Sequence, residues 1–182
     1  INLMKGQPAQ AEPSLRSLAN AFPKSASVQS EVGMLEMSKG NRAAARAAFT
    51  RALAMNPTFV PALEGMNQLD LQEKRVDQVR ARMADALRAK PKDTGMLVLA
   101  ARTYGSLDDW AAAENMLQQV IAVDPNHLDA YSMLGRIYAR QQRLDNRGGV
   151  LVTHHANHQG RALRVPAREV AVTRWRGLEG AA

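Results

Sequence analysis

The stretch IAVDPNHLDAYSMLGRIYAR, residues 121–140, places a proline between two apolar runs that both have helical spacing. Proline lacks the amide hydrogen that a helix interior needs, and its ring clashes with the preceding turn. It also moves the residue before it out of the helical region. Pro125 is therefore expected to end one helix and to let a second, antiparallel helix begin.

This break recurs along the chain at a fixed interval. Pro23, Pro57, Pro91 and Pro125 follow one another 34 residues apart. Other columns keep the same period. One column holds large apolar side chains, at Leu15, Phe49, Met83 and Leu117, and another holds mostly small residues, at Gly33, Asn67, Ala101 and Gly135. A fixed period of this length indicates a chain built from repeated helix pairs.

The pattern resembles the tetratricopeptide repeat family, in which a large and then a small residue mark the first helix, and alanine, a large residue, alanine and proline mark the second. The first full unit matches at Val32-Gly33, Ala45, Phe49, Ala52 and Pro57. The departures are polar residues where large or aromatic ones are usual, at Gln29, Glu36 and Asp70, and Val79 where alanine is usual. The resemblance implies an all-α fold, a right-handed solenoid of antiparallel helix pairs.

The spacing predicts repeat units at 26–59, 60–93 and 94–127, with a partial unit at 128–145. Residues 1–25 resemble the second helix of a truncated repeat. Because the chain starts with Ile1 in the middle of a repeat, we expect a fragment of a longer repeat array. Repeats that are cut open expose apolar faces, which would allow end-to-end self-association.

Short polar residues mark the turns inside the units. Asn41 and the Asp108-Asp109 pair precede helical runs and are candidate N-caps. Trp110 follows this pair directly and is expected to pack between helices.

The repeat stops near residue 145, and residues 146–182 contain no lysine or methionine, with six arginines against two glutamates. Two interpretations stay open: a native basic tail that is poorly ordered, or the product of a shifted reading frame. His154 and His158 would share a helix face beside His155, but no further ligand or orienting carboxylate is apparent, so no metal site is predicted.

Catalytic motifs are absent from the sequence. There is no cysteine, which excludes disulfides, thiolate metal sites and cysteine nucleophiles. There is also no GxSxG, HExxH, GxGxxG or phosphate-loop pattern. We therefore expect no enzyme activity and no cofactor.

Net charge and hydropathy bear on whether the chain binds nucleic acid or crosses a membrane. The net charge is +7, but residues 1–145 carry 18 basic against 15 acidic side chains. Nucleic-acid binding is therefore not favoured. The longest apolar run, Met96 to Ala101, is far below the roughly 20 residues of a membrane span. The compartment, cytoplasmic or periplasmic, stays open.

The resemblance also implies a concave groove lined by the first helices of the units. Methionine suits varied peptide ligands because its shape adapts, and arginine forks bind carboxylates. The groove residues carried over from the family are Ser30, Met34, Met37, Glu64, Gln68, Leu71, Val98, Arg102, Asp129, Ser132, Arg136 and Arg140.

These features together predict a non-catalytic scaffold for protein–protein interaction, which binds a peptide or a helix of a partner in that groove. The first alternative is a regulatory or targeting arm of a larger enzyme. A related alternative is that the chain is part of an envelope or polysaccharide-export assembly, which the resemblance implies for bacterial repeat proteins of this kind. A nucleic-acid binder that uses the basic tail is the least favoured alternative.

Overall fold

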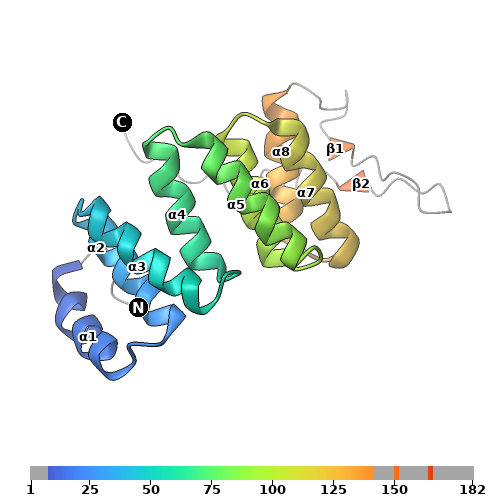
Figure 1. The fold of residues 1–182 in the computed structure, drawn as a ribbon. Helices are drawn as coiled ribbons and strands as arrows, with labels where there is room; N and C mark the ends of the chain where they lie inside the picture. The colour runs from blue at the N-terminus through green and yellow to red at the C-terminus, as the bar shows by residue number, and fades with distance from the viewer. Residues whose placement is uncertain (1–7, 142–149, 152–163, 166–182) are drawn as a thin grey trace, which may run out of the picture. The chain divides into compact units, whose positions relative to one another are not determined.

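The structure is a computed structural model that describes residues 8–141, 150–151 and 164–165. Within these residues the helices are α1 (Pro8–Ala21), α2 (Ala26–Ser38), α3 (Arg42–Met55), α4 (Val60–Gln72), α5 (Val76–Ala89), α6 (Thr94–Ser106), α7 (Trp110–Val123) and α8 (Leu128–Arg140) (Figure 1). The chain divides into two compact units, residues 1–103 and 104–182, and the division falls inside α6.

The helices begin at equivalent positions in every repeat. The first helices of the pairs start at Ala26, Val60, Thr94 and Leu128, and the second helices start at Arg42, Val76 and Trp110. Both series have the 34-residue interval of the prolines. The predicted all-α solenoid of helix pairs is thus confirmed, while the domain boundaries at residues 25 and 145 stay predictions.

The turn inside each pair repeats down to a single hydrogen bond. The amides of Asn41, Arg75 and Asp109 donate to the carbonyl oxygens of Glu36, Asp70 and Tyr104, over 2.8, 2.8 and 2.9 Å. Such a bond closes a helix end when the residue directly before the donor has a left-handed backbone. The three left-handed residues are Gly40, Lys74 and Asp108, with φ angles of 79°, 58° and 57°.

The break between pairs is equally regular. The residues before three of the prolines, Asn56, Lys90 and Asp124, have ψ angles of 96°, 71° and 93°, outside the helical region. Their amides still donate to the carbonyl four residues earlier, at 2.9, 3.0 and 2.8 Å. Each proline therefore follows a completed helix end, as its steric demand on the preceding residue requires.

The core of the first unit is built around the ring of Phe49 on α3, which is fully buried. Gly33 on α2 and Gly65 on α4 leave room for this ring, because a Cβ at Gly33 would lie 2.5 Å from it and one at Gly65 closer still. The buried cluster around the ring consists of Ala45, Ala52, Ala62, Met66 and Leu69. At Gly33, the small column predicted from the sequence thus admits one large side chain.

In the second unit α7 packs against α8. Leu117, Leu134 and Tyr138 are buried there, and the Tyr138 hydroxyl donates to the Glu114 carboxylate over 2.8 Å. A Cβ at Gly105 of α6 would lie 3.5 Å from the Trp110 ring. The prediction that Trp110 packs between helices is therefore confirmed.

The predicted N-caps differ in outcome. The carboxylate of Asp109 accepts from the Ala112 amide at 3.3 Å and caps α7 as expected. The prediction for Asn41 is wrong: this residue precedes α3, but its side chain makes no capping bond. It donates instead to the Glu36 carboxylate, 2.7 Å away, because that acceptor lies on the same turn.

Beyond the repeats, the structure describes only two short strands. β1 (Val150–Leu151) pairs antiparallel with β2 (Arg164–Val165), and Val150 lies opposite Val165. The rest of 146–182 lies outside the described residues. That includes the histidine cluster at His154, His155 and His158, so the metal and reading-frame questions stay predictions.

Candidate functional site

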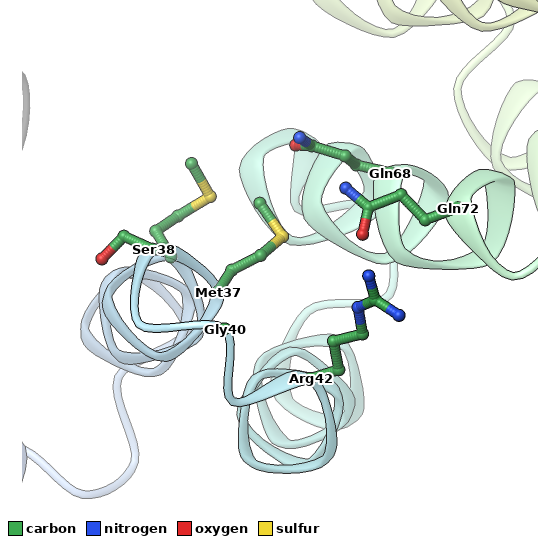
Figure 2. A pocket seen from close by; sticks show the side chains of 7 residues that line it. Met37, Ser38, Gly40, Arg42, Gln68 and Gln72 are labelled. Atoms are coloured by element: carbon green, nitrogen blue, oxygen red, sulfur yellow. The ribbon is translucent and has the colours of Figure 1, made fainter.

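A pocket of about 450 Å³ opens in the first unit where α2 ends, α3 begins and α4 ends. Three of the residues predicted to face a groove, Met34, Met37 and Gln68, line it. The complete lining is Met34, Met37, Ser38, Gly40, Arg42, Gln68 and Gln72. In Figure 2 the side chains of Met37, Gln68, Gln72 and Arg42 extend toward the same space.

The two methionines hold different positions in the pocket. Met34 is 41% exposed, so its thioether forms an open apolar surface. Met37 is half-buried and packs against the cluster around Phe49. One methionine is therefore anchored in the core, and the other is available to adapt to a ligand.

The polar lining comes from helix ends. Gln68 and Gln72 lie one turn apart on α4, and their amide groups can both donate and accept hydrogen bonds. Arg42 is the first residue of α3 and is exposed. The pocket thus combines an apolar wall, two amides and one cation.

Glu64 and Arg102, also predicted groove residues, form an ion pair at 3.6 Å. Both side chains are more than half exposed, so the pair contributes little to stability. It does neutralise this stretch of the surface of the first unit.

Three further predicted groove residues, Leu71 on α4, Val98 on α6 and Ser132 on α8, are half-buried. The last three lie on α8, in the second unit. Asp129, Arg136 and Arg140 are all exposed. The Arg140 guanidinium lies 4.8 Å from the centre of the Trp110 ring and 3.9 Å from the Asp108 carboxylate. Arg140 is therefore already engaged with its own unit.

The prediction that Ser30 faces the groove is wrong. Its side chain is 2% exposed and belongs to the interior. Ser30 shares a helical stripe with Met34 and Met37, four and seven residues further on, but only those two methionines line the open pocket.

A charged network lies inside the first unit and was not predicted. The Asp70 carboxylate on α4 is fully buried and pairs with Arg82 of α5 and, at 2.8 Å, with Arg46 of α3. Arg46 also reaches Glu73 at 3.0 Å. Arg82 donates to the amide oxygen of the buried Asn67 over 2.7 Å.

This network sets the charge state of Asp70. Burial alone would raise the pKa of the carboxyl group, but the hydrogen bonds and charges of Arg82 and Arg46 outweigh it. The pKa is therefore lowered below its usual value, and Asp70 is ionised at neutral pH. A polar residue at the repeat's aromatic position is stabilised by two cations from the flanking helices.

Sequence reasoning missed Arg42, Gln72 and Gly65. Arg42 and Gln72 adjoin the turns, outside the groove positions of the first helices. Gly65 does not belong to the small column, because the equivalent residues are Glu31, Leu99 and Met133. The signal that could have found Gly65 is Phe49, the largest residue of its column, which needs an extra small neighbour.

No helix among the described residues is both long and apolar enough to cross a lipid bilayer. The comparison with curated proteins gave no match. Solved structures do match, at identities that establish the fold alone.

Among these, the pilF protein of Pseudomonas aeruginosa has a TM-score of 0.60 and 15% identity, over 78% of this chain and 65% of that one. The chain thus spans slightly less than two thirds of that structure. A MamA fragment from Desulfovibrio magneticus RS-1 has a TM-score of 0.54 and 18% identity, over 78% of this chain and 80% of that one. A chain of the APC/C hetero-tetramer Cut9–Hcn1 has a TM-score of 0.59 and 20% identity, over 75% of this chain and 26% of that one.

The sequence itself identifies the family. Residues 3–59 and 98–146, together more than half of the chain, match the tetratricopeptide repeat description. The 34-residue helix pairs and their repeated turns agree with that match. The chain belongs to the tetratricopeptide repeat family.

Proposed function

We propose that this helical repeat scaffold binds a peptide or a helix of a partner protein at the pocket formed by α2, α3 and α4, and that it carries out no catalysis itself. The observation that carries the proposal is the convergence of Met34, Met37 and Gln68 on one open space. Adaptable thioethers beside amide groups suit a polypeptide, which offers apolar side chains and a hydrogen-bonding backbone together.

The general role is supported by the family, whose repeats form binding surfaces. It is also supported by the Cut9–Hcn1 structure, in which a chain of this fold is part of a hetero-tetramer. The pocket volume lies within the range of roughly 300–1,000 Å³ that is usual for ligand sites.

The test is a selection of short peptides from a random library on the whole chain, followed by affinity measurements on a variant of the pocket. Met34→Glu introduces a charge at an exposed position, so the fold is expected to survive. Met55→Glu is the matched control, because Met55 is 38% exposed on α3 and does not line the pocket.

The proposal expects Met34→Glu to weaken peptide binding by about tenfold or more, because the variant removes an apolar contact and places a carboxylate where the peptide would exclude water. Met55→Glu should bind as the wild type does. Circular dichroism confirms that both variants keep their helix content. Equal affinity in all three proteins would contradict binding at this pocket.

Two alternatives are tested in other ways. A nucleic-acid binder would lose affinity steeply with salt and would lose it entirely when residues 146–182 are deleted. A regulatory arm of a larger enzyme, or a part of an envelope or polysaccharide-export assembly, would be found from the full-length reading frame. Changing Arg102 to Glu tests whether the binding surface of the first unit extends beyond this pocket, and changing Arg136 to Glu tests the second unit separately.

A further inference from the structure

Arg42 is the cation of the pocket, and no acidic side chain among the described residues pairs with it. Its neighbours in the first unit are compensated. Arg46 and Arg82 pair with Asp70, and Lys39 pairs with Glu36 at 3.1 Å. The pocket lining itself holds no carboxylate. A positive charge therefore faces this space without an internal counter-charge in the described part of the unit.

The start of α3 adds to this positive potential. The first turn of the helix contains no acidic residue, and no hydrogen bond from its amides reaches the Asn41 side chain, which donates to Glu36. The Arg42 amide donates to the Gly40 carbonyl at 2.9 Å, so the uncapped amides are those that follow it. Unsatisfied amides at a helix start carry a partial positive charge. The guanidinium and the helix end thus favour the same kind of ligand group.

The rest of the pocket lining is neutral. Met37 supplies apolar surface, and Gln68 and Gln72 supply amides (Figure 2). Met34 adds to the apolar surface. An apolar side chain would pack on the thioethers, and a peptide backbone would hydrogen-bond with the amides. A free phosphate ion would leave the methionine wall unused.

We propose that the occupant of this pocket is an acidic peptide segment of a partner, with a carboxylate on Arg42 and a neighbouring apolar side chain on Met34 and Met37. This inference rests on the proposed function and specifies the chemistry of the ligand. Charge complementarity selects the carboxylate, and the thioether wall selects the adjacent apolar residue.

The experiment uses synthetic peptides in matched pairs, in which a glutamate or aspartate next to leucine is replaced by the corresponding amide. Their affinities are measured with the whole chain, with Arg42→Gln and with Arg88→Gln. Arg88 is the matched control, because it is an exposed arginine of the same unit, on α5, that pairs with Asp85. Inorganic phosphate is titrated separately as a simple anion.

The wild type should prefer the acidic peptide to its amide partner by about tenfold, the scale of one charge-assisted hydrogen bond. Arg42→Gln should abolish this preference, and Arg88→Gln should keep it. Arg42→Glu should reverse it, so that peptides with lysine in place of the acidic residue bind best.

Failure of this inference can be distinguished from failure of the proposed function. If acidic and amide peptides bind equally, and Met34→Glu still weakens both, the pocket binds peptides but the carboxylate assignment is wrong. If phosphate alone displaces the peptide fully, Arg42 acts as a general anion site and the inference is overturned. If no peptide binds, both proposals are overturned.

Discussion

Arg46 of α3 lies 2.8 Å from the carboxylate of Asp70 on α4, and Arg82 of α5 holds the other oxygen of the same group. One buried acid therefore joins two consecutive repeats. The carboxylate is fully buried, while the two guanidinium groups remain partly exposed to water. The arrangement compensates an acid that would otherwise be costly to bury.

Asp70→Asn should destabilise the first unit by roughly 3 kcal/mol, because it leaves two guanidinium groups without their buried counter-charge. Urea denaturation followed by circular dichroism measures the loss. The control is Asp85→Asn, which breaks the exposed pair with Arg88 and should leave the midpoint almost unchanged. Equal losses in the two variants would show that burial does not distinguish the two ion pairs.

The stability of the chain should also depend on pH through Asp70. Its folded pKa lies below the unfolded value, which is about 3.9. The stabilisation is therefore complete above about pH 4 and is lost as the pH falls through the lower folded pKa. Denaturation of the wild type and of Asp70→Asn across this range should give a flatter profile for the variant.

In the Asp70→Asn variant, part of the pH dependence of the folding stability remains, because it comes from the Glu36 carboxyl group. A hydrogen bond from Asn41 and another from Lys39 lower the pKa of Glu36. The difference between the two profiles therefore isolates Asp70. Parallel profiles for wild type and variant would contradict a lowered pKa at this position.

The sequence predicted the helix pairs well because their determinants are local. Proline and the column of apolar residues recur every 34 positions, and the observed helix starts follow them. The helical spacing predicts a buried stripe at Ala45, Phe49, Ala52 and Leu53. The first three are fully buried, and Leu53 is half-buried. Local spacing decides which residues face the core.

The missed features depend on contacts between distant residues. Asp70 stands at a usually aromatic position, and no local pattern shows that Arg46 and Arg82 reach it from other helices. Asn41 has the sequence of a cap, but Glu36 competes for its side chain. Three predicted groove residues meet in one pocket, yet its cation, Arg42, lies beside a turn.

Gly65→Ala should destabilise the first unit by about 2 kcal/mol, because the added methyl group would overlap the buried ring of Phe49. The same change in a Phe49→Leu background should cost clearly less, since the smaller side chain leaves space. Gly105→Ala is the control, with its Cβ at an ordinary 3.5 Å from Trp110. Additive costs of Gly65→Ala and Phe49→Leu would be evidence against this packing.

Lys74→Gly should stabilise the chain by roughly 0.5–1 kcal/mol, because Lys74 has a left-handed backbone that glycine adopts without strain. At the equivalent position of the first helix pair, the left-handed residue is already a glycine, Gly40. A Cβ at Gly40 would meet no atom within 4 Å, so Gly40→Ala tests the backbone cost alone and should destabilise by a similar amount. Thermal unfolding of both variants checks the signs, and changes in the same direction would refute this explanation.

Arg140→Ala should expose one face of the Trp110 ring, because the guanidinium lies 4.8 Å from the ring centre. The measurement uses a Trp175→Phe background, in which Trp110 is the sole tryptophan. We expect stronger quenching by acrylamide and a loss of about 0.5–1 kcal/mol, the usual scale of an exposed cation–π contact. Arg136→Ala, one turn earlier on the exposed surface of α8, is the control and should change neither quantity. If both variants expose Trp110 equally, Arg140 does not cover the ring and would again be available as a groove residue.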